Sequence, residues 1–387
     1  MAGEVAIIGA GQSRFGVRKE GIKTLFAEAF FECLDSVDKG VAPDQIQEAF
    51  VGSMSFGGGQ LGNLAALMTE QVGLQYIPTR KVENACASSS YALRDAWLAI
   101  RSGLVDLALV AGVEKMTDLP PDRRRYWLGV SNDTEWERLA GSTFAGLYAL
   151  MACRHMHEYG TKREALAQVA VKNHLYGSHN PKAHFRKPIK LESVLQAPTV
   201  AHPLTLYDCC PVSDGASALL LTKKELAKRF TDSPVYLLAS AGASDFLALH
   251  DRDEITKVEG TVRAGREAFK QARISPKDVD MAELHDAFTI AEIMALEDLG
   301  FCEKGRGGTW ALEGRTEIGG NLPVNVSGGL KAKGHPIGAT GAGQVVEVFK
   351  QLRNEAEEGR QVPDAELALT HNVGGSAATI AVHIFSR

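Results

Sequence analysis

The sequence contains few cysteines, and none are arranged as a metal site or disulfide framework. Its six cysteines include no C-x-x-C pair. Cys209 and Cys210 are adjacent, where a mutual disulfide would be strained. No stretch reaches 18 unbroken apolar residues, so the sequence predicts no membrane span. A formal net charge of -5 and a pI near 6.2 argue against a nucleic-acid-binding surface.

Targeting signals are missing as well. The chain opens directly into the strand-like run Val5–Gly9, with no charged leader and no apolar leader core. The last residues, Phe385–Arg387, carry no address signal. We therefore expect a cytoplasmic protein. The 45% apolar and 23% charged residues are typical of a soluble globular protein, and 387 residues can hold two or three domains.

What the sequence does contain is a weak internal duplication. The matching segments are Val5–Phe15 with Val235–Asp245, Pro43–Val51 with Pro276–Leu284, and Asp106–Val113 with Glu366–Val373. The first two matches have spacings that agree within three residues, which is hard to obtain by chance. Each copy reads as strand, helix, Pro-led strand, helix, strand. This alternation predicts two similar α/β halves with parallel pairing and right-handed crossovers.

The stretch between the copies has a different composition and predicts an inserted loop domain. Residues 118–204 contain an arginine run, scattered Trp and Tyr, helical patterns over 143–159 and 163–176, and a basic, His-rich segment. We expect an N-terminal half over 1–117 that is completed by 205–232, where Val212–Leu221 returns to a strand pattern. The C-terminal half then spans 233–387. Two such halves create a cleft where helix N-termini converge, and ligands bind in such crevices.

Cys86 is the first candidate functional residue. A short segment ends near Val82, and an amphipathic stretch begins at Tyr91, so the thiol lies at a strand-to-helix junction. A helix N-terminus favours a thiolate over a thiol, and a thiolate there is a ready nucleophile. The alternative is a small buried residue among Ala and Ser, since free cysteine is commonly buried.

Three histidines occupy comparable turns in the second half. His285 precedes a helical pattern over Thr289–Leu299, His335 lies in a Gly-rich loop that opens the helix Gln344–Leu352, and His371 sits where the last strand pair turns. Each could alone be a capping or packing group. The loop lacks the order of a phosphate-binding motif, and the spacing of the histidines is too wide for the usual metal sites. One Cys with three such His is better explained by nucleophilic acyl chemistry without a metal.

These residues resemble the thiolase superfamily along the whole chain. The motifs, in order, are Asn84-Ala-Cys-Ala-Ser88, Gly112-Val-Glu-Lys-Met116, Ser213-Asp-Gly-Ala216, His285-Asp-Ala-Phe288, Asn325-Val-Ser-Gly-Gly329, Gly334-His-Pro-Ile-Gly-Ala-Thr-Gly341 and His371-Asn-Val-Gly-Gly375. The Gly-His-Pro-x-Gly-Ala-Thr-Gly loop is highly specific. The His-Asp-x-Phe and His-Asn-x-Gly forms are similar to the sterol-carrier-type and archaeal acetoacetyl-CoA branch. Degradative thiolases carry Asn-Glu-Ala-Phe and Cys-x-Gly-Gly-Gly there instead.

The resemblance implies a fold and a set of roles. The fold is an α-β-α-β-α layered sandwich of two βαβαβαββ halves with an inserted loop domain. Cys86 would be the acylated nucleophile, and His335 would activate it and then help to bind the thioester oxygen. His285 would form part of an oxyanion hole, directly or through a water. The backbone N–H groups of Cys86 and of Gly374 or Gly375 would form a second hole.

One departure from the family pattern concerns the second acid/base. Thiolases usually place a cysteine in the last motif, where this chain has His371, or in a His-Asp-Cys-Phe motif, where it has Ala287. Neither cysteine is present. His371 or His285 must serve, or the substrate must need less help.

The inserted segment contacts coenzyme A in this family. The basic residues that could pair with its phosphates are Arg123, Arg124, Arg125, Lys182, Arg186 and Lys187. Each could equally belong to a solvated basic face. Cys210 falls where related enzymes place a serine beside the pantetheine arm, and we interpret it as a wall residue. The resemblance implies coenzyme A as a substrate and no bound cofactor.

Through this resemblance the sequence predicts a thiolase-type acyl-CoA:CoA C-acyltransferase that works through a Cys86 acyl-enzyme, either cleaving a 3-oxoacyl-CoA with CoA or condensing acyl-CoAs. Its substrate would be acetoacetyl-CoA or a bulkier, aryl 3-oxoacyl-CoA; the run Arg123–Trp127 would suit the latter if it lined the pocket. The alternatives are a thiolase-fold retro-aldolase, against which Cys86 counts, and a non-catalytic CoA-binding scaffold. The resemblance implies a homodimer or dimer of dimers, and a small zinc-ribbon/OB-fold protein as a partner.

Overall fold

Nine strands form one mixed sheet in the computed structural model, which describes residues 5–387. The strand order is β3-β2-β4-β7-β1-β8-β11-β10-β9. The first half supplies β1 (Val5–Gln12), β2 (Glu48–Gly52), β3 (Thr79–Val82), β4 (Leu107–Glu114) and β7 (Gly215–Lys223). The second half supplies β8 (Val235–Ser244), β9 (Met281–Glu283), β10 (Leu367–Gly374) and β11 (Thr379–Ser386). Residues 1–4 of the predicted N-terminal half lie outside the described part of the chain.

The strand pairing repeats in the two halves. In the first, β2 pairs with β4 in parallel, and β7 pairs antiparallel with both β4 and β1. In the second, β9 pairs with β10 in parallel, and β11 pairs antiparallel with both β10 and β8. The halves meet where Val5–Ile7 pairs antiparallel with Val235–Leu237. The counterpart of β3 is reduced to a single bridge between Ala282 and Val324. The predicted duplication is therefore confirmed.

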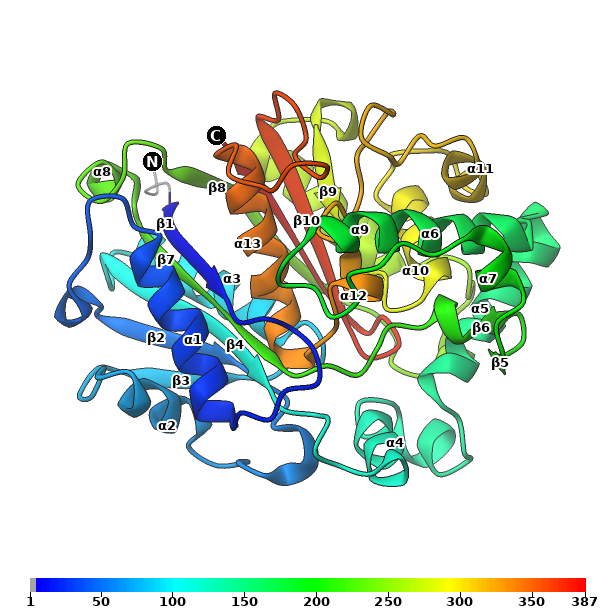
Figure 1. The fold of residues 1–387 in the computed structure, drawn as a ribbon, viewed down its shortest axis with the longest axis horizontal. Helices are drawn as coiled ribbons and strands as arrows, with labels where there is room; N and C mark the ends of the chain where they lie inside the picture. Colours follow the sequence, from blue (N-terminus) through cyan, green and yellow to red (C-terminus); the bar gives the residue numbers. More distant parts are fainter. Residues whose placement is uncertain (1–4) are drawn as a thin grey trace.

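Helices cover and separate the two groups of strands. They are α1 (Ile22–Asp35), α2 (Leu64–Gln71), α3 (Ser88–Arg101) and α8 (Lys224–Ala227) in the first half, and α9 (Glu259–Ala272), α10 (Thr289–Asp298), α11 (Gly307–Leu312), α12 (Gly329–Ala332) and α13 (Thr340–Leu352) in the second. Figure 1 shows α13 at the centre, with strands of the two halves on either side.

Alternation along the strands explains this layering. In β1, Val5 and Ile7 join the cluster that contains α3 and α13 side chains, whereas Ala6 and Ile8 join the cluster under α1 and α2. In β8 a bulge at Leu238 interrupts the alternation, so Leu237 faces the central helices while Ala239, two residues on, faces the outer cluster around α9 and α10. β1 is therefore buried on both faces, and β8 contributes side chains to both the central and the outer cluster, as the predicted α-β-α-β-α sandwich requires.

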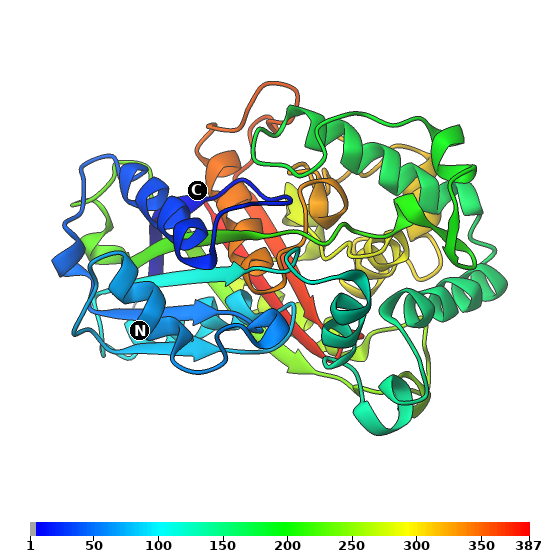
Figure 2. The same cartoon turned by 60° about the horizontal axis from the view of Figure 1, so that its bottom comes forward.

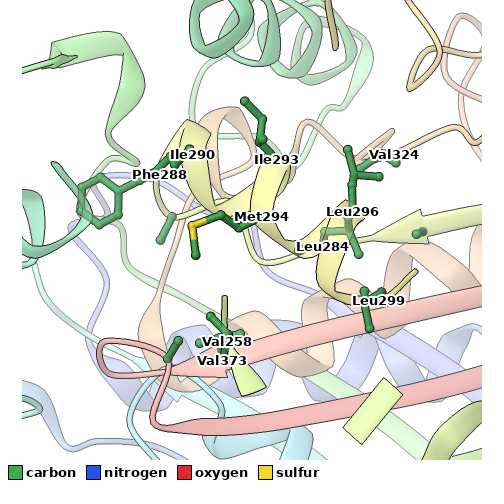
Figure 3. Close-up of a cluster of buried hydrophobic side chains, with 14 of the residues drawn as sticks. Val258, Leu284, Phe288, Ile290, Ile293, Met294, Leu296, Leu299, Val324 and Val373 are labelled. Atoms are coloured by element: carbon green, nitrogen blue, oxygen red, sulfur yellow. The ribbon is translucent and has the colours of Figure 1, made fainter. Parts of the chain in front are cut away.

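The outer helix α10 shows how this packing fixes a histidine-bearing segment. Its side chains Ile290, Ile293 and Met294 are almost wholly buried and pack in the same cluster as Val258 and Val373, as Figure 3 shows. Burying side chains of this size contributes about 1.5–3 kcal/mol each. His285 lies just before this helix, so the core anchors the segment that carries it.

The stretch between β4 and β7 forms a helical excursion, which Figure 2 shows beside the sheet. It contains α4 (Pro121–Gly129), α5 (Phe144–Tyr159), α6 (Arg163–His179) and α7 (Leu191–Leu195), followed by the hairpin of β5 (Thr199–Ala201) and β6 (Leu204–Thr205). The two helices expected over 143–159 and 163–176 are present. The boundary placed at 204/205 falls inside β6. None of the helices in residues 5–387 has the length and apolarity needed to cross a membrane.

Two strands expected to begin at proline begin later. Pro43–Gln45 and Pro276–Asp278 each form one 3-10 turn, and β2 and β9 follow them. Pro at the first position of such a turn costs no hydrogen bond, since that N–H has no partner there.

The halves approach so closely that one position in β4 has no room for a side chain. A Cβ on Gly112 would overlap the carbonyl oxygen of Gly338 and lie 2.8 Å from both Ala339 Cα and Ser89 Cβ. Two of these neighbours are backbone atoms of the segment that follows His335, so they cannot move aside without shifting it.

We expect Gly112→Ala to destabilise the protein by about 1–3 kcal/mol through overpacking. The matched control is Gly62→Ala, because a Cβ at Gly62 would meet nothing within 4 Å. Chemical denaturation followed by circular dichroism measures both. Equal midpoints for the two variants would contradict the close approach of the halves.

Candidate active site

Cys86 lies in a tight turn between β3 and α3. Ala85, just before it, has a left-handed φ of 48°, which is uncommon for a residue with a side chain. The turn is held by Ser88, whose Oγ accepts from the N–H of Asn84 at 3.0 Å and donates to the carbonyl of Ala85 at 2.6 Å. The Glu83 carboxylate accepts from the N–H of Ala85 at 2.7 Å. Local hydrogen bonds thus offset the cost of the strained residue.

The next two serines fasten this turn to the second half. Ser89 Oγ accepts from the N–H of Ala342 in α13 at 2.9 Å, and Ser90 Oγ donates to Asn372 Oδ1 in β10 at 2.9 Å. Ser88, Ser89 and Ser90 are all buried. Ser89 and Ser90 therefore act in the interior, where they join the two halves of one chain.

His335 presents an unprotonated nitrogen to the site. Its Nδ1 lies 2.6 Å from Thr340 Oγ1, and that hydroxyl donates its own proton to the carbonyl of Pro336 at 3.0 Å. The Thr340 oxygen can therefore only accept from the imidazole, so Nδ1 carries the proton and Nε2 has the lone pair. Burial lowers the pKa of His335 to about 3, which keeps the ring neutral.

His285 has the opposite tautomer. Asn372 uses its Oδ1 to accept from Ser90, and its Nδ2 lies 3.0 Å from His285 Nδ1. The amide donates, so Nδ1 accepts and Nε2 carries the proton. Burial, with help from the neighbouring His335 and His371, holds the pKa of His285 well below its usual value. The two rings, 5.2 Å apart and nearly perpendicular, thus offer one donor and one acceptor.

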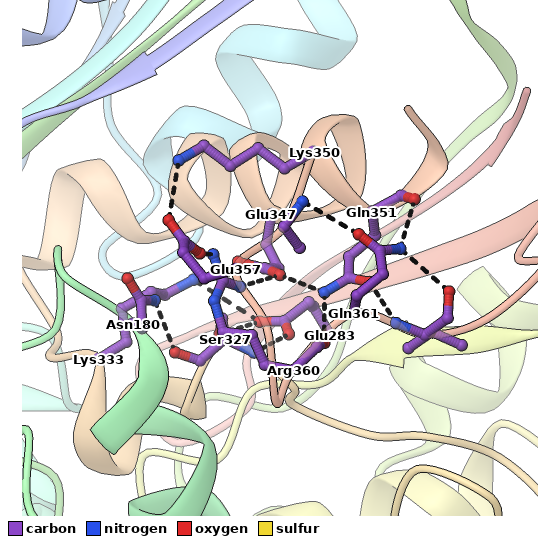
Figure 4. Close-up of polar contacts among 12 residues, drawn as sticks. Asn180, Glu283, Ser327, Lys333, Glu347, Lys350, Gln351, Glu357, Arg360 and Gln361 are labelled. Atoms are coloured by element: carbon purple, nitrogen blue, oxygen red, sulfur yellow. Dashed lines mark hydrogen bonds and ion pairs between the residues drawn. The ribbon is translucent and has the colours of Figure 1, made fainter. Parts of the chain in front are cut away.

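A buried polar network joins the two histidine-bearing segments, as Figure 4 shows. Glu283, two residues before His285, accepts from Ser327 Oγ at 2.5 Å and lies 3.6 Å from the ammonium of Lys333, two residues before His335. Lys333 also donates to the carbonyl of Gly343 at 3.1 Å. Separating such a buried pair would leave an uncompensated charge, which is costly. The network therefore holds the segments that carry His285 and His335 in a fixed relative position.

Glu114 fixes the loop after His335 from the other side. Its carboxylate is fully buried and accepts from the N–H groups of Met54, Phe56 and Gly338 at 2.9, 2.8 and 3.0 Å. Burial raises the pKa of Glu114, and the backbone donors oppose that shift. Its remaining hydrogen bond comes from the Ser53 hydroxyl at 3.2 Å, so this acid is a scaffold for the loops around the sulfur.

The resting form of Cys86 differs from the expected thiolate. Burial raises the pKa of the thiol to about 12, although the backbone N–H groups of Gly375 and of Cys86 itself contact the sulfur and oppose the shift. Glu114 adds to the rise. The thiol is half-buried at an interior end of the site, where loss of hydration outweighs the helix N-terminus. At rest the pair is a neutral thiol beside a neutral imidazole.

Cys86, His285 and His335 converge in one cavity of about 600 Å³. The sulfur and one nitrogen of each ring all lie within 4.8 Å of one another. The same cavity is lined by Gly375 and by Tyr148, whose ring stacks on Phe288 with centroids 4.6 Å apart. Burial raises the pKa of Tyr148, so its hydroxyl stays protonated and can donate.

His371 and Gly374 lie outside this cavity. His371 faces a separate small cavity behind His285, and its Nε2 lies 3.0 Å from Thr261 Oγ1. Burial lowers its pKa to about 3. Gly374 packs against the backbone of Asn84, where a Cβ would not fit. Of the two glycines proposed for the second oxyanion hole, only Gly375 touches the sulfur.

The basic residues divide into three groups. Arg124 and Arg125 on α4 line the Cys86 cavity, together with Cys210. Arg186 and Lys187 line a different groove. Lys182 pairs with Glu32, and Arg123 is exposed and lines neither space. Nε of Arg124 is buried without a hydrogen-bond partner in residues 5–387.

Cys86, His285 and His335 also have the spacing of a metal site. In the tautomer found here, His285 directs an N–H and not a lone pair toward its neighbours, so binding a cation would require Asn372 to reverse its hydrogen bonds. The donor set thus fits a ligand oxygen better than a cation, and the absence of a metal requirement stays a prediction.

Sequence reasoning missed several residues that shape this site. Thr340 and Asn372 stand inside motifs already singled out, and a polar residue beside a buried histidine is the signal that could have indicated a tautomer-fixing role. Tyr148 gave no such signal, because its place in the cavity depends on how α5 packs.

Comparisons with known proteins agree with this arrangement. The family model for the thiolase N-terminal domain matches residues 5–225, and that for the thiolase C-terminal domain-like family matches 241–387. An acetyl-CoA acetyltransferase of Methanothermobacter thermautotrophicus is 47% identical over 386 residues, covering 99% of this chain and 100% of the relative. The benzoylsuccinyl-CoA thiolase subunit BbsB of Thauera aromatica is 33% identical and covers 96% and 95%.

Among solved structures, one described as an Ltp2-ChsH2(DUF35) aldolase matches with a TM-score of 0.84 at 24% identity, covering 98% of this chain and 97% of the other. At that identity the match supports the fold alone. The family models together span nearly the whole chain, and the archaeal relative matches it from end to end. The chain therefore belongs to the thiolase family.

Proposed function

We propose that this protein is a thiolase-type acyl-CoA:CoA C-acyltransferase that works through an acyl-enzyme on Cys86. The observation that carries the proposal is the convergence of the Cys86 sulfur with His285 and His335 within 4.8 Å, one ring offering a lone pair and the other an N–H. A nucleophile with an adjacent acceptor and a nearby donor for an oxyanion is the arrangement that acyl transfer needs.

In the first step the sulfur attacks the acyl carbon of an acyl-CoA. The thiol proton passes to Nε2 of His335 as the C–S bond forms. The bond to the CoA sulfur then breaks, and that sulfur takes the proton from His335, which leaves acylated Cys86 and free CoA. The N–H groups of Gly375 and Cys86 contact the sulfur at rest, so they lie close to the oxygen of the acyl group.

In the condensing direction a second acetyl-CoA supplies the carbon nucleophile. Its α-proton passes to His335, which is neutral again, while the N–H of His285 binds the thioester oxygen where charge develops. The new C–C bond displaces the Cys86 sulfur, which takes the proton from His335, and a 3-oxoacyl-CoA is released. His335 therefore replaces the second cysteine, because His285 is a donor and His371 lies outside the cavity.

We propose acetyl-CoA and acetoacetyl-CoA as the substrates, with reaction in either direction. The name of the 47% identical archaeal relative supports this choice. Of the run Arg123–Trp127, only Arg124 and Arg125 line the cavity, so its aromatic residues do not favour an aryl group. These two arginines would bind the CoA phosphates, with Cys210 as wall. CoA is a substrate here, and no bound cofactor is proposed.

Two rival functions make different demands on the site. A retro-aldolase does not need the thiol that this site holds between two imidazoles, and a CoA-binding scaffold does not need the paired tautomers. Both stay alternatives for the acylation experiment below to test.

We further propose assembly with a second copy of the chain. β3 is the outermost strand of the sheet, so one of its edges lacks a partner within residues 5–387, and Cys86 follows four residues after it. A zinc-ribbon/OB-fold partner and a cytoplasmic location remain predictions from the sequence. The DUF35 component of the matched aldolase structure supports a search for such a partner.

Incubation with acetyl-CoA should add one acetyl group to the Cys86 peptide, detected by mass spectrometry after rapid acid quench. Cys86→Ala should abolish both the adduct and turnover. Cys210→Ala, which changes a thiol in the same cavity, should retain the adduct. No adduct on the folded wild-type protein with acetyl-CoA or acetoacetyl-CoA would disprove the acyl-enzyme and leave the rival functions.

The raised pKa of Cys86 predicts how its alkylation depends on pH. Because the folded pKa is about 12, the thiolate fraction rises about tenfold per pH unit throughout the neutral and mildly alkaline range. The rate of carbamidomethylation of the Cys86 peptide by iodoacetamide should follow this slope from pH 7 to about 9.5. A plateau below pH 8 would show that the thiolate is already formed at rest.

His285→Ala should lower kcat for acetoacetyl-CoA thiolysis roughly 100-fold, since one lost oxyanion donor costs about 3 kcal/mol. His285→Asn keeps an N–H in place and should stay within about tenfold of wild type. Steady-state thiolysis assays compare the two variants. If Asn were as damaging as Ala, the ring would act as a base and not as a donor.

A further inference from the structure

A second groove lies apart from the Cys86 cavity and shares no lining residue with it. It has a volume of about 960 Å³. It is built from Arg14 after β1, the C-terminal end of α6, the segment 181–189, and Tyr207. Nothing in the proposed acyl transfer uses it.

The rim of this groove carries unpaired positive charge. Arg14, Arg186 and Lys187 are exposed, and none of them forms an ion pair within residues 5–387. The single acid on the lining, Glu357, is already paired with Arg360. The chain as a whole has a net charge of -5, so this concentration of positive charge is local. It favours an anion, and phosphate in particular, since arginine recognises phosphate by paired hydrogen bonds.

The floor of the groove is aromatic and contains an unsatisfied polar group. His174 is 3% exposed, and neither of its ring nitrogens makes a hydrogen bond of full geometry in residues 5–387, although the backbone of Lys187 approaches the ring. Burial lowers its pKa to about 4, although the backbone of Lys187 opposes this, so the ring is neutral and offers one donor and one acceptor. A buried polar group without partners costs about 1–3 kcal/mol, which a ligand would recover.

Two further rings complete this floor. Phe185 lies nearly parallel to His174 with centroids 5.6 Å apart, and Tyr207 meets it edge-on at 5.9 Å. Phe185 is also 40% exposed, so a large apolar ring faces outward beside Arg186. A planar heterocycle can stack on such rings while its polar edge reaches an imidazole.

We propose that this groove is a binding site for a nucleoside phosphate, with the base against Phe185 and Tyr207, a polar edge of the base on His174, and the phosphates on Arg14, Arg186 and Lys187. The nucleoside phosphate could carry phosphate at the 5′ position alone, as in ADP, or at both the 3′ and 5′ positions, as in adenosine 3′,5′-bisphosphate. Both sources share the chemistry that the groove recognises.

The groove wall is also hydrogen-bonded to the segment that carries His335, which decides the choice of variants. His184 and Phe185 donate from their backbone N–H groups to the carbonyls of Lys333 and Ala332, both at 2.9 Å. His184 Nδ1 lies 2.9 Å from Ser213 Oγ, which accepts from the N–H of His335 at 3.2 Å. Substitution of His184 would therefore disturb the active site, whereas Arg186 and Lys187 point to solvent and make no such contact.

Isothermal titration calorimetry with ADP, adenosine 3′,5′-bisphosphate and inorganic phosphate tests the proposal. The double variant Arg186→Ala/Lys187→Ala should weaken binding of the nucleotides at least tenfold, and His174→Phe should weaken them while phosphate is unaffected. Lys190→Ala, an exposed cation on the same segment but off the groove, is the matched control and should bind as wild type. Tighter binding of ADP or of the bisphosphate identifies the source.

Arg124→Ala separates this groove from the Cys86 cavity, which Arg124 lines. Nucleotide binding that survives Arg124→Ala and is lost in Arg186→Ala/Lys187→Ala supports the groove. The reverse pattern would place the nucleotide at the Cys86 cavity and overturn the proposal, as would no binding of either nucleotide at about 1 mM, or equal affinity for inorganic phosphate. None of these outcomes depends on catalytic activity, so failure here leaves the acyl-enzyme intact.

Discussion

The contact between the first turn of α3 and the second half of the chain is the constraint on which the site depends. Each of the three serines after Cys86 makes a different contact, because one closes the turn, one accepts from α13 and one donates to β10. Gly341, at the start of α13, leaves no space for a Cβ, which would overlap Ser90 Oγ and lie 2.6 Å from Asn372 Oδ1. Backbones can come this close only where side chains are absent or very small. The sulfur therefore meets histidines that are some 200 and 250 residues away in sequence because the halves interlock at these positions.

The same interlocking decides the chemistry of the thiol. Packing the two halves together removes water from around Cys86, and the loss of hydration penalises the charged forms of the thiol and of both imidazoles at once. A helix N-terminus stabilises a charge by about 0.3–1 kcal/mol, up to about 2 in a favourable site, which is small beside such desolvation. In the proposed mechanism the nucleophile forms only when the proton has an acceptor in place, and the lone pair of His335 is that acceptor. This favours generation of the thiolate during attack over storage of it at rest.

Much of the fold could be predicted from the sequence because repetition is visible in residue patterns. The matches between Val5–Phe15 and Val235–Asp245, and between the segments of β4 and β10, correctly indicated equivalent strands. The convergence of Cys86, His285 and His335 followed from their motifs. The tautomers did not, because they depend on whether Thr340 and Asn372 donate or accept in three dimensions. The sequence also could not predict that Arg124 and Arg186 line different cavities, because a basic residue in the sequence does not indicate which cavity its side chain reaches.

His371 shows why the direction in which a side chain points matters for the mechanism. In sequence it stands where other thiolases place their second cysteine, so it was a natural substitute. Side chains alternate along β10, and Asn372, its neighbour, takes the inward position beside His285 while His371 turns to the opposite side, next to Thr261. A strand can present only one of two adjacent residues to a given face. Asn372, which holds His285 in its donating tautomer, therefore takes the position from which His371 could have served as a base. The mechanism that we propose accordingly assigns the proton transfers of both steps to His335.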